Sequence, residues 1–298
     1  MDELAAAPSV TRPFALAGVF SVLPTPFHED GALDLAGLEA LVRAHADAGV
    51  AGLTALGVMG EAAELSEVER SAVLERVVAT AAGLPVVVGI SGPSTDVVTD
   101  RALLAARQGA RGLMVSPSRT LGLGPALDAA AAGGLPIVIQ DYPLGSGVEL
   151  SVEDLVAAAQ ARPLVSGIKT EAPPTAGAIA TLRSRLPRLG LAGGLGGLFL
   201  VDELRAGASG VMTGFALPER LVAIVSSFAD DPEGAERAWL ALLPLMRFEA
   251  FPPASLAARK EVWRLRGVIG SSHCRRPGAV LDAVVREDVR RAFELVAG

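Results

Sequence analysis

The feature that most constrains the fold is a repeated alternation of short apolar runs with longer segments of helical spacing. Each run has the length of a strand and is rich in β-branched residues, and an Ala/Leu-rich segment with an apolar face follows it. Continuous apolar runs are typical of strands buried on both faces, and the lack of hairpin signals between them favours parallel strands. The runs cover residues 19–23, 52–56, 86–90, 113–116, 137–142, 165–169, 189–192 and 211–213.

Eight strand–helix units in series predict a (β/α)8 TIM barrel, with an open, doubly wound parallel sheet as the alternative. Ser66-Glu67-Val68-Glu69 has the pattern of a capping box, and Ser151 marks another capped helix start. After Pro218 the pattern becomes purely helical, with helices expected at residues 221–228, 235–248, 256–266 and 284–296. We therefore expect the barrel over residues 15–225 and a C-terminal helical extension of the same domain over residues 226–298, with a break at Pro252-Pro253.

Charge and composition exclude several classes of protein. The net charge is −7 and no basic stripe is present, which argues against a nucleic-acid partner. No apolar stretch reaches about 18 residues without a charge, Gly or Pro, so no membrane span is expected. Asp2 and Glu3 stand where a signal peptide would have a basic start. Cys274 is the only cysteine, and the acidic residues lack metal-ligand spacing. We expect a cytoplasmic protein without a membrane partner, metal ion or cofactor.

Lysine is almost absent from the chain. Of its 26 basic residues, 24 are arginines and two are lysines, Lys169 and Lys260. Lys260 lies in the arginine-rich helical pattern Arg259-Lys260-Glu261 and is interpreted as ordinary compositional drift. Lys169 ends a buried apolar run, and in a barrel of this type the ends of the strands carry the functional residues.

Lys169 is the main catalytic candidate. Burial against apolar strands removes hydration from an ammonium group and favours the free amine, which can attack a carbonyl and form a Schiff base. The alternative is a buried ion pair with Glu171 or Asp141. Two glycine-rich segments at strand ends are candidates for anion binding: the Gly57–Glu61 turn, which includes Val58 and Met59, and the Gly193–Gly197 segment.

The strand-end segments, in this order, resemble those of the dihydrodipicolinate synthase / N-acetylneuraminate lyase family of class I aldolases. The matching positions are residues 25–27, Gly57, Gly60, Glu61, residues 65–70, Pro117, residues 143–147, residues 167–169, residues 207–210 and Pro218. The resemblance implies a homo-oligomer, either a tetramer or a dimer, and a Schiff base between Lys169 and a small 2-oxo acid, typically pyruvate. It also implies that the backbone around Val58 and Met59 binds the substrate carboxylate, and that Thr25, Gly193 and Thr213 contribute to the site.

The chain departs from this family at several functional positions. Val58 and Met59 replace two threonines, and Gln140 replaces a tyrosine. A further tyrosine is missing where Ser118 and Arg119 stand. The family's threonine–tyrosine proton relay is therefore absent. Gly145 occupies the place of the arginine that holds the second substrate in lysine-pathway synthases, so that activity is not expected.

Two reactions fit what remains, and both use an imine on Lys169. A dehydratase acting on a 2-keto-3-deoxy sugar acid is favoured, because it needs no second carbonyl substrate. A pyruvate-dependent aldolase and a non-catalytic barrel that binds 2-oxo acids are the alternatives. Tyr142, the only tyrosine, or Glu171 is expected to move protons, while Gln140 hydrogen-bonds the substrate. In the alternative arrangement, Pro143 turns the strand early and Tyr142 packs outward at a subunit contact.

Overall fold

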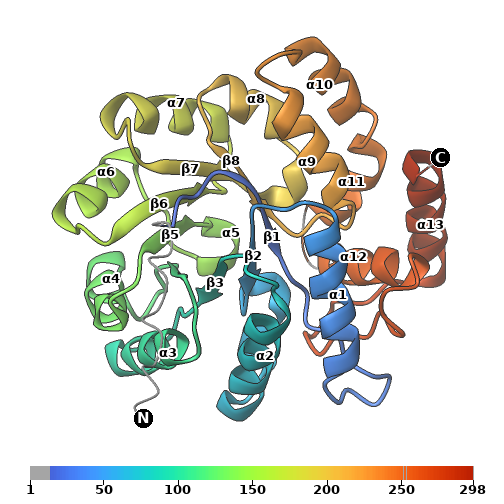
Figure 1. Ribbon diagram of the computed structural model, residues 1–298, viewed down its shortest axis with the longest axis horizontal. Helices are drawn as coiled ribbons and strands as arrows, with labels where there is room; N and C mark the ends of the chain where they lie inside the picture. The colour runs from blue at the N-terminus through green and yellow to red at the C-terminus, as the bar shows by residue number, and fades with distance from the viewer. Residues whose placement is uncertain (1–13, 251, 253, 298) are drawn as a thin grey trace, which may run out of the picture.

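Eight parallel strands close into one barrel in chain order, with β8 hydrogen-bonded back to β1 (Figure 1). This computed structural model describes residues 14–250, 252 and 254–297. The strands are β1 (Gly18–Val22), β2 (Gly52–Ala55), β3 (Val86–Gly89), β4 (Gly112–Val115), β5 (Ile137–Asp141), β6 (Val165–Thr170), β7 (Gly190–Gly193) and β8 (Gly210–Thr213). The predicted TIM barrel is confirmed, and the open sheet is excluded.

Helices follow the strands and form the outer ring of the barrel (Figure 1). They are α1 (Leu35–Asp47), α2 (Glu67–Thr80), α3 (Thr95–Arg107), α4 (Leu123–Ala130), α6 (Val152–Ala161), α7 (Thr175–Arg185), α8 (Leu200–Arg205) and α9 (Pro218–Ser227). The short helix α5 (Pro143–Ser146) was not predicted. Ser66 and Ser151 each form a capping box, with Glu69 and Asp154 as partners. These caps satisfy backbone N–H groups that a helix start leaves unpaired.

Apolar side chains form two layers, one inside the barrel and one between the strands and the surrounding helices. Phe20, Val87, Met114, Val138 and Met212 belong to the cluster inside the barrel, and a larger cluster lies between the strands and the helices. Burying a side chain of this size stabilises the fold by roughly 1.5–3 kcal/mol. Within residues 14–297, apart from 251 and 253, no helix combines the length and the apolar character needed to cross a bilayer.

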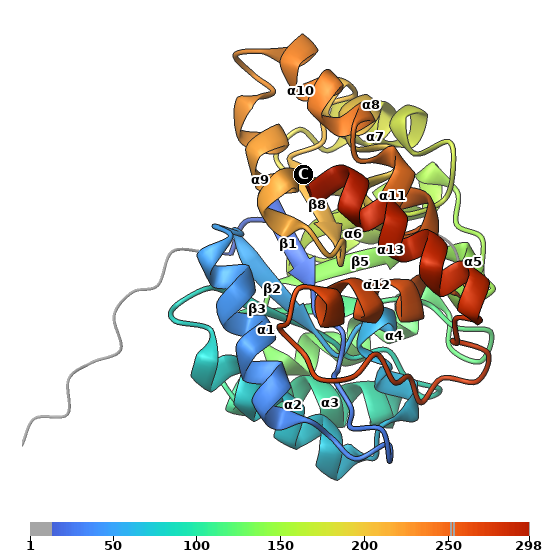
Figure 2. The same cartoon turned by 90° about the vertical axis from the view of Figure 1, so that its right-hand side faces the viewer.

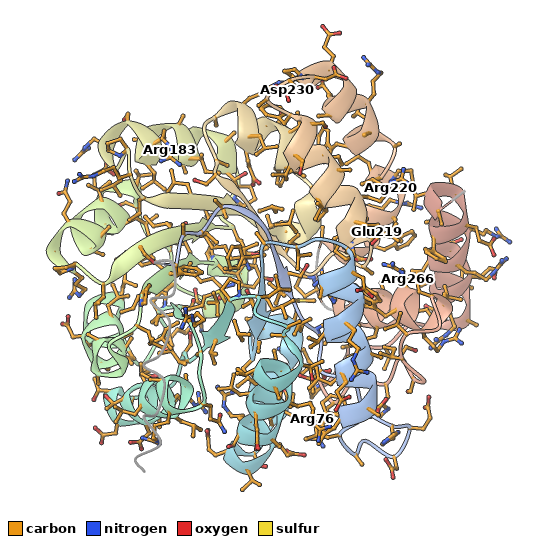
Figure 3. All side chains as sticks on the ribbon, viewed as in Figure 1. Arg76, Arg183, Glu219, Arg220, Asp230 and Arg266 are labelled. Carbon is orange, nitrogen blue, oxygen red and sulfur yellow. The ribbon has the colours of Figure 1, made fainter. Side chains whose placement is uncertain are left out.

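Charged side chains project from the outer helices (Figure 3). Arg183 of α7 donates to the carbonyl oxygens of Gly207 and Leu189, at 2.9 and 3.0 Å. These hydrogen bonds connect α7 to the segment after α8 and to the residue that precedes β7. Arg266 pairs with Glu219 of α9 at 3.2 Å. Ion pairs as exposed as these contribute at most about 1 kcal/mol each, so the buried apolar layers hold the barrel together.

The C-terminal extension consists of α10 (Pro232–Leu240), α11 (Leu243–Glu249), α12 (Ala254–Leu265) and α13 (Ala283–Ala297). Figure 2 shows α11, α12 and α13 packed together on one side of the barrel. The single helix expected at residues 235–248 is wrong. It is divided between α10 and α11, because Pro244 in the first turn of α11 cannot continue a helix from its N-terminal side.

The structure locates the expected start of the C-terminal extension and the expected break within it. The expected limit between barrel and extension, at residues 225 and 226, falls inside α9. The break expected at Pro252-Pro253 lies between α11 and α12, but Pro253 is outside the described residues.

Candidate active site

A cavity of about 450 Å³ lies at the C-terminal ends of the strands. Seven of the predicted site residues line this central cavity: Val58, Met59, Gln140, Tyr142, Lys169, Glu171 and Thr213. They come from the ends of β5, β6 and β8 and from the turn after β2. The predicted residues Thr25 and Gly193 do not line it. Most of the predicted residues therefore meet at the C-terminal ends of the strands, as is typical of TIM barrels.

Lys169 lies near the end of β6 with a side chain that is only 6% exposed. Its Nζ is 2.9 Å from Oε2 of Glu171, so the carboxylate facing Lys169 is that of Glu171 rather than Asp141. The neighbouring strand β7 places the small residue Ala192 beside Lys169 in the sheet register. The ion pair leaves the amine beside a proton acceptor within hydrogen-bond distance, which is the arrangement that a general base requires.

Glu171 is held from three directions. Besides Lys169, the amide Nε2 of Gln140 donates to Oε2 at 2.7 Å, and the backbone N–H of Leu195 donates to Oε1 at 3.2 Å. Gln140 therefore bonds to the carboxylate, a partner that the sequence did not indicate. A carboxylate fixed in this way keeps one orientation toward Lys169.

The glycine-rich segment after β7 makes room for Glu171. A Cβ on Gly194 would lie 2.1 Å from Oε1 of Glu171, so only glycine fits at this position. A Cβ on Gly193 would lie 1.8 Å from Oε2 of Glu203, which belongs to α8. The Cβ direction of Gly193 therefore points to the helix layer, and its predicted substrate contact stays a prediction. The anion that this segment binds is the protein's own carboxylate.

The turn after β2 forms a 3₁₀ helix at Val58–Gly60. Its internal hydrogen bonds use the N–H groups of Gly60 and Glu61, and within the described residues the N–H groups of Val58 and Met59 have no protein partner. Thr25 supports this turn from behind, because its buried hydroxyl donates to the carbonyl oxygen of Gly60 at 2.6 Å. Thr25 therefore positions the turn, and its predicted substrate contact stays a prediction.

Lys260 is fully buried, so its interpretation as compositional drift is wrong. Its Nζ donates to Glu61, which ends the turn after β2, and to the carbonyl oxygen of His273 at 2.8 Å. It also lies 4.4 Å from the centre of the Phe27 ring. Burial lowers the pKa of Lys260. The other carboxylate oxygen of Glu61 accepts from the backbone N–H of Arg276 at 2.7 Å. The C-terminal extension thus holds the turn in place.

The extension also contributes residues to the central cavity, and sequence reasoning missed all of them. Glu249, Ser255 and Arg259 line it. Nε of Arg259 donates to Oε2 of Glu249 at 3.0 Å, and the same oxygen accepts from the N–H of Ala216 at 3.1 Å. The signal in the sequence is the charged run 259–261 within a helical pattern that is otherwise largely apolar on its N-terminal side. In the structure every residue of α12 from 255 to 263 is buried.

Tyr142 lines the cavity and does not pack outward. β5 ends at Asp141, one residue earlier than expected, because Pro143 begins α5. The Tyr142 ring covers Gly145, where a Cβ would approach Cδ1 of the ring to 2.4 Å. Burial, together with the charge of Glu171, raises the pKa of Tyr142. The phenol therefore holds its proton across the neutral range.

Two further carboxyl groups lie behind the cavity wall. Burial, aided by the charge of Glu171, raises the pKa of Asp141 to about 6. Burial raises the pKa of Glu203 to about 7, against the hydrogen bond that Thr175 donates to it at 2.7 Å.

Known proteins resemble this chain along nearly its whole length. The profile described as the dihydrodipicolinate synthetase family matches residues 15–295. A 4-hydroxy-tetrahydrodipicolinate synthase of Sorangium cellulosum is 34% identical over 268 residues, covering 85% of this chain and 89% of that protein. An L-2-keto-3-deoxyarabonate dehydratase of Azospirillum brasilense is 34% identical over 280 residues, covering 87% and 88%. The crystal structure of a dihydrodipicolinate synthase from Rhodopseudomonas palustris superposes with a TM-score of 0.88 at 34% identity, covering 94% of this chain and 97% of that one.

Proposed function

The chain belongs to the dihydrodipicolinate synthetase family, and we propose that within it the protein is a Schiff-base lyase that dehydrates a 2-keto-3-deoxy sugar acid. The observation that carries this proposal is the buried pair of Lys169 and Glu171, with 2.9 Å between Nζ and Oε2. It places a nucleophilic amine and a proton acceptor side by side in one cavity. A dehydratase of this substrate class, from Azospirillum brasilense, is similar over 87% of the chain, so the proposed reaction occurs among its relatives.

The first steps bind the substrate and form the imine. The free N–H groups of Val58 and Met59 hold the substrate carboxylate at the start of the 3₁₀ turn. Lys169 passes a proton to Glu171 and attacks the keto carbon, C2. The resulting carbinolamine loses its hydroxyl as water, which leaves a protonated imine on Nζ. This imine withdraws electrons from C3 and makes a proton on C3 acidic.

Dehydration follows from the same imine. Glu171 removes a proton from C3, and the electron pair forms an enamine. The enamine expels the hydroxyl on C4, which takes up a proton from the carboxyl group of Glu171 or from Tyr142 and leaves as water. Hydrolysis of the imine then releases the product and restores the amine, so the net change is the loss of one water. A positioned acid–base group of this kind typically contributes about 10²–10⁴ in rate.

The site argues against the lysine-pathway condensation. That reaction needs an arginine at Gly145, and here the Tyr142 ring occupies the space where a side chain would begin. The amide of Gln140, which stands in place of a relay tyrosine, is bonded to Glu171. The synthase of Sorangium cellulosum and the dehydratase of Azospirillum brasilense are equally identical to this chain, so we base the choice on the site residues. We expect no useful rate of condensation between pyruvate and aspartate semialdehyde.

One experiment separates the candidate reactions. The protein is incubated with a panel of 2-keto-3-deoxy sugar acids, with and without borohydride, and analysed by mass spectrometry. A dehydratase gives a product lighter by one water, an aldolase gives pyruvate and an aldehyde, and a non-catalytic barrel gives only a trapped adduct. The adduct should lie on Lys169 and disappear in Lys169→Met. A label on Lys260, or full turnover by Lys169→Met, would refute the mechanism.

We also propose that the protein acts as a homo-oligomer, either a dimer or a tetramer, as the family resemblance predicts. Exposed apolar side chains such as Leu144, beside the mouth of the barrel, are consistent with a subunit contact. Sedimentation velocity measures this directly, and a monomer at all concentrations would contradict the proposal.

A further inference from the structure

A second chamber adjoins the central cavity on the side of β2, β3 and β4. We call it the outer chamber. It has an empty volume of about 1120 Å³ and shares Val58, Met114, Gln140 and Tyr142 with the wall of the central cavity. A substrate whose keto carbon is bound to Lys169 can therefore extend past Tyr142 into the outer chamber. The mechanism proposed above makes no use of this space.

The lining of the outer chamber is positively charged. Arg70, Arg101 and Arg276 line it, and no Asp or Glu does so. Four serine hydroxyls add to its polar surface, from the ends of β3 and β4 and from α5: Ser91, Ser116, Ser118 and Ser146. This lining suits an anionic, hydroxylated molecule.

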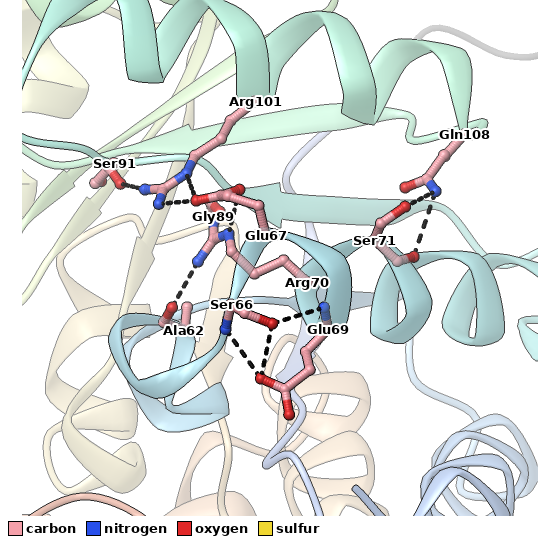
Figure 4. A network of polar contacts seen from close by, with 10 residues as sticks. All are labelled: Ala62, Ser66, Glu67, Glu69, Arg70, Ser71, Gly89, Ser91, Arg101 and Gln108. Atoms are coloured by element: carbon pink, nitrogen blue, oxygen red, sulfur yellow. Dashed lines mark hydrogen bonds and ion pairs between the residues drawn. The ribbon is translucent and has the colours of Figure 1, made fainter.

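Arg70 and Arg101 are held rigidly against the backbone (Figure 4). Arg70 is buried and donates to the carbonyl oxygens of Ala62 and Gly89, at 2.7 and 3.2 Å. Arg101 donates to the carbonyl oxygen of Ser91 and to Glu67. Glu67 is the carboxylate that both guanidinium groups share. The pair therefore keeps a net positive charge beside the chamber.

The positive charge of Arg276, unlike those of Arg70 and Arg101, is not paired with a carboxylate in the described part of the chain. Among residues 14–250, 252 and 254–297, no carboxylate lies within ion-pair distance of its guanidinium group. Its Nη2 donates to the carbonyl oxygen of Val58 at 2.9 Å, which places the cation where the two chambers meet. Its other guanidinium nitrogens have no hydrogen-bond partner in the described structure. Arginine presents several donors in a planar fork, which matches a carboxylate or a phosphate.

We propose that the outer chamber binds a second anionic group at the far end of the substrate, with Arg276 as its principal partner. This inference rests on the proposed function and narrows its substrate class. The substrate would be a 2-keto-3-deoxy sugar acid that carries a terminal carboxylate or a terminal phosphate rather than a terminal hydroxymethyl group. The hydroxyl side chains of the chamber would contact the carbon chain between the two ends.

The test compares three substrates that share one carbon chain. They are a 2-keto-3-deoxy aldonic acid with an uncharged end, the matching aldaric acid and the terminal phosphate ester. We expect kcat/KM to be at least about tenfold higher for one of the charged substrates, and the better one identifies the anion. Arg276→Gln should reduce this preference at least about tenfold, mainly through KM, while Arg107→Gln on the exposed end of α3 should leave it unchanged.

A second variant guards against a structural effect of Arg276→Gln. Ser118→Asp adds a negative charge to the chamber without touching the turn at Val58, so it should lower kcat/KM at least about tenfold more for the charged substrates than for the uncharged one. Equal kcat/KM for all three substrates, or the same preference in both variants, would overturn the inference. Either result would leave the proposed function intact if borohydride still traps pyruvate on Lys169. Loss of that adduct in the unaltered protein would instead refute the proposed function itself.

Discussion

Replacing Lys260 by methionine tests whether the C-terminal extension holds the active-site turn. Methionine preserves most of the side-chain volume but removes the ammonium that binds Glu61 and the carbonyl oxygen of His273. Both members of the ion pair are fully buried. Among the described residues, the Glu61 carboxylate would then keep only the backbone N–H of Arg276 as a hydrogen-bond donor.

The expected cost follows from this burial. Removing one member of a buried ion pair typically costs 3–5 kcal/mol, since the remaining charge is left uncompensated, and we expect Lys260→Met to lose about that much unfolding free energy. In the double variant Lys260→Met/Glu61→Gln both charges are absent. The unfolding free energy lost by the double variant should be smaller than the sum of the losses of Lys260→Met and Glu61→Gln by at least about 2 kcal/mol. The reason is that each single variant leaves the other charge buried without a partner.

Urea unfolding of the three variants gives these free energies from the midpoint and the slope. Arg107→Met, an exposed change on α3, serves as the control and should stay within about 0.5 kcal/mol of the unaltered protein. Borohydride trapping of pyruvate provides the functional measurement, since a displaced turn should raise the pyruvate concentration needed. A loss below about 1 kcal/mol for Lys260→Met, or additive losses in the double variant, would refute the reasoning.

Three further predictions concern the carboxyl and phenol groups of the site. Glu171→Gln keeps the side-chain shape but not the proton acceptor, so kcat should fall about 10²–10⁴-fold, and a kcat near that of the unaltered protein would rule out Glu171 as the base. Tyr142→Phe should lower kcat at least about tenfold while leaving imine formation with pyruvate intact, and an unchanged kcat removes Tyr142 from the mechanism. Burial raises the pKa of Glu203 from its ordinary 4.5 to about 7, so the folded protein retains a proton that the unfolded chain has lost, and unfolding free energy should fall as pH rises through that window. Glu203→Gln should remove this part of the decline, and parallel pH curves for the two proteins would contradict the assignment.

The parts of the site that the sequence predicts are those that depend on topology alone. Parallel strands that alternate with helices bring all strand C-termini to one mouth, so Lys169, Gln140 and Thr213 meet wherever the loops run. The alternation of side chains along a strand also places Glu171 on the same side as Lys169.

The sequence is less informative where adjacent residues face opposite sides of a strand. It is also less informative where segments distant in the sequence come into contact. At the end of β7, neighbouring positions face opposite sides, so Gly193 abuts Glu203 while Gly194 adjoins Glu171. Periodicity cannot decide between two adjacent glycines. Arg259 and Lys260 reach the site because the extension packs back over the mouth of the barrel, and local spacing carries no information about that path.

The burial of both lysines has a practical consequence for amine chemistry. Neither of the two lysines of this chain presents an ammonium on the surface, because Lys260 is enclosed and Lys169 opens only into the cavity. A bulky acylating reagent therefore finds no lysine ammonium on the surface to modify. A reagent small enough to enter the barrel would instead reach Lys169. The amount attached to Lys169 would then count intact active sites directly.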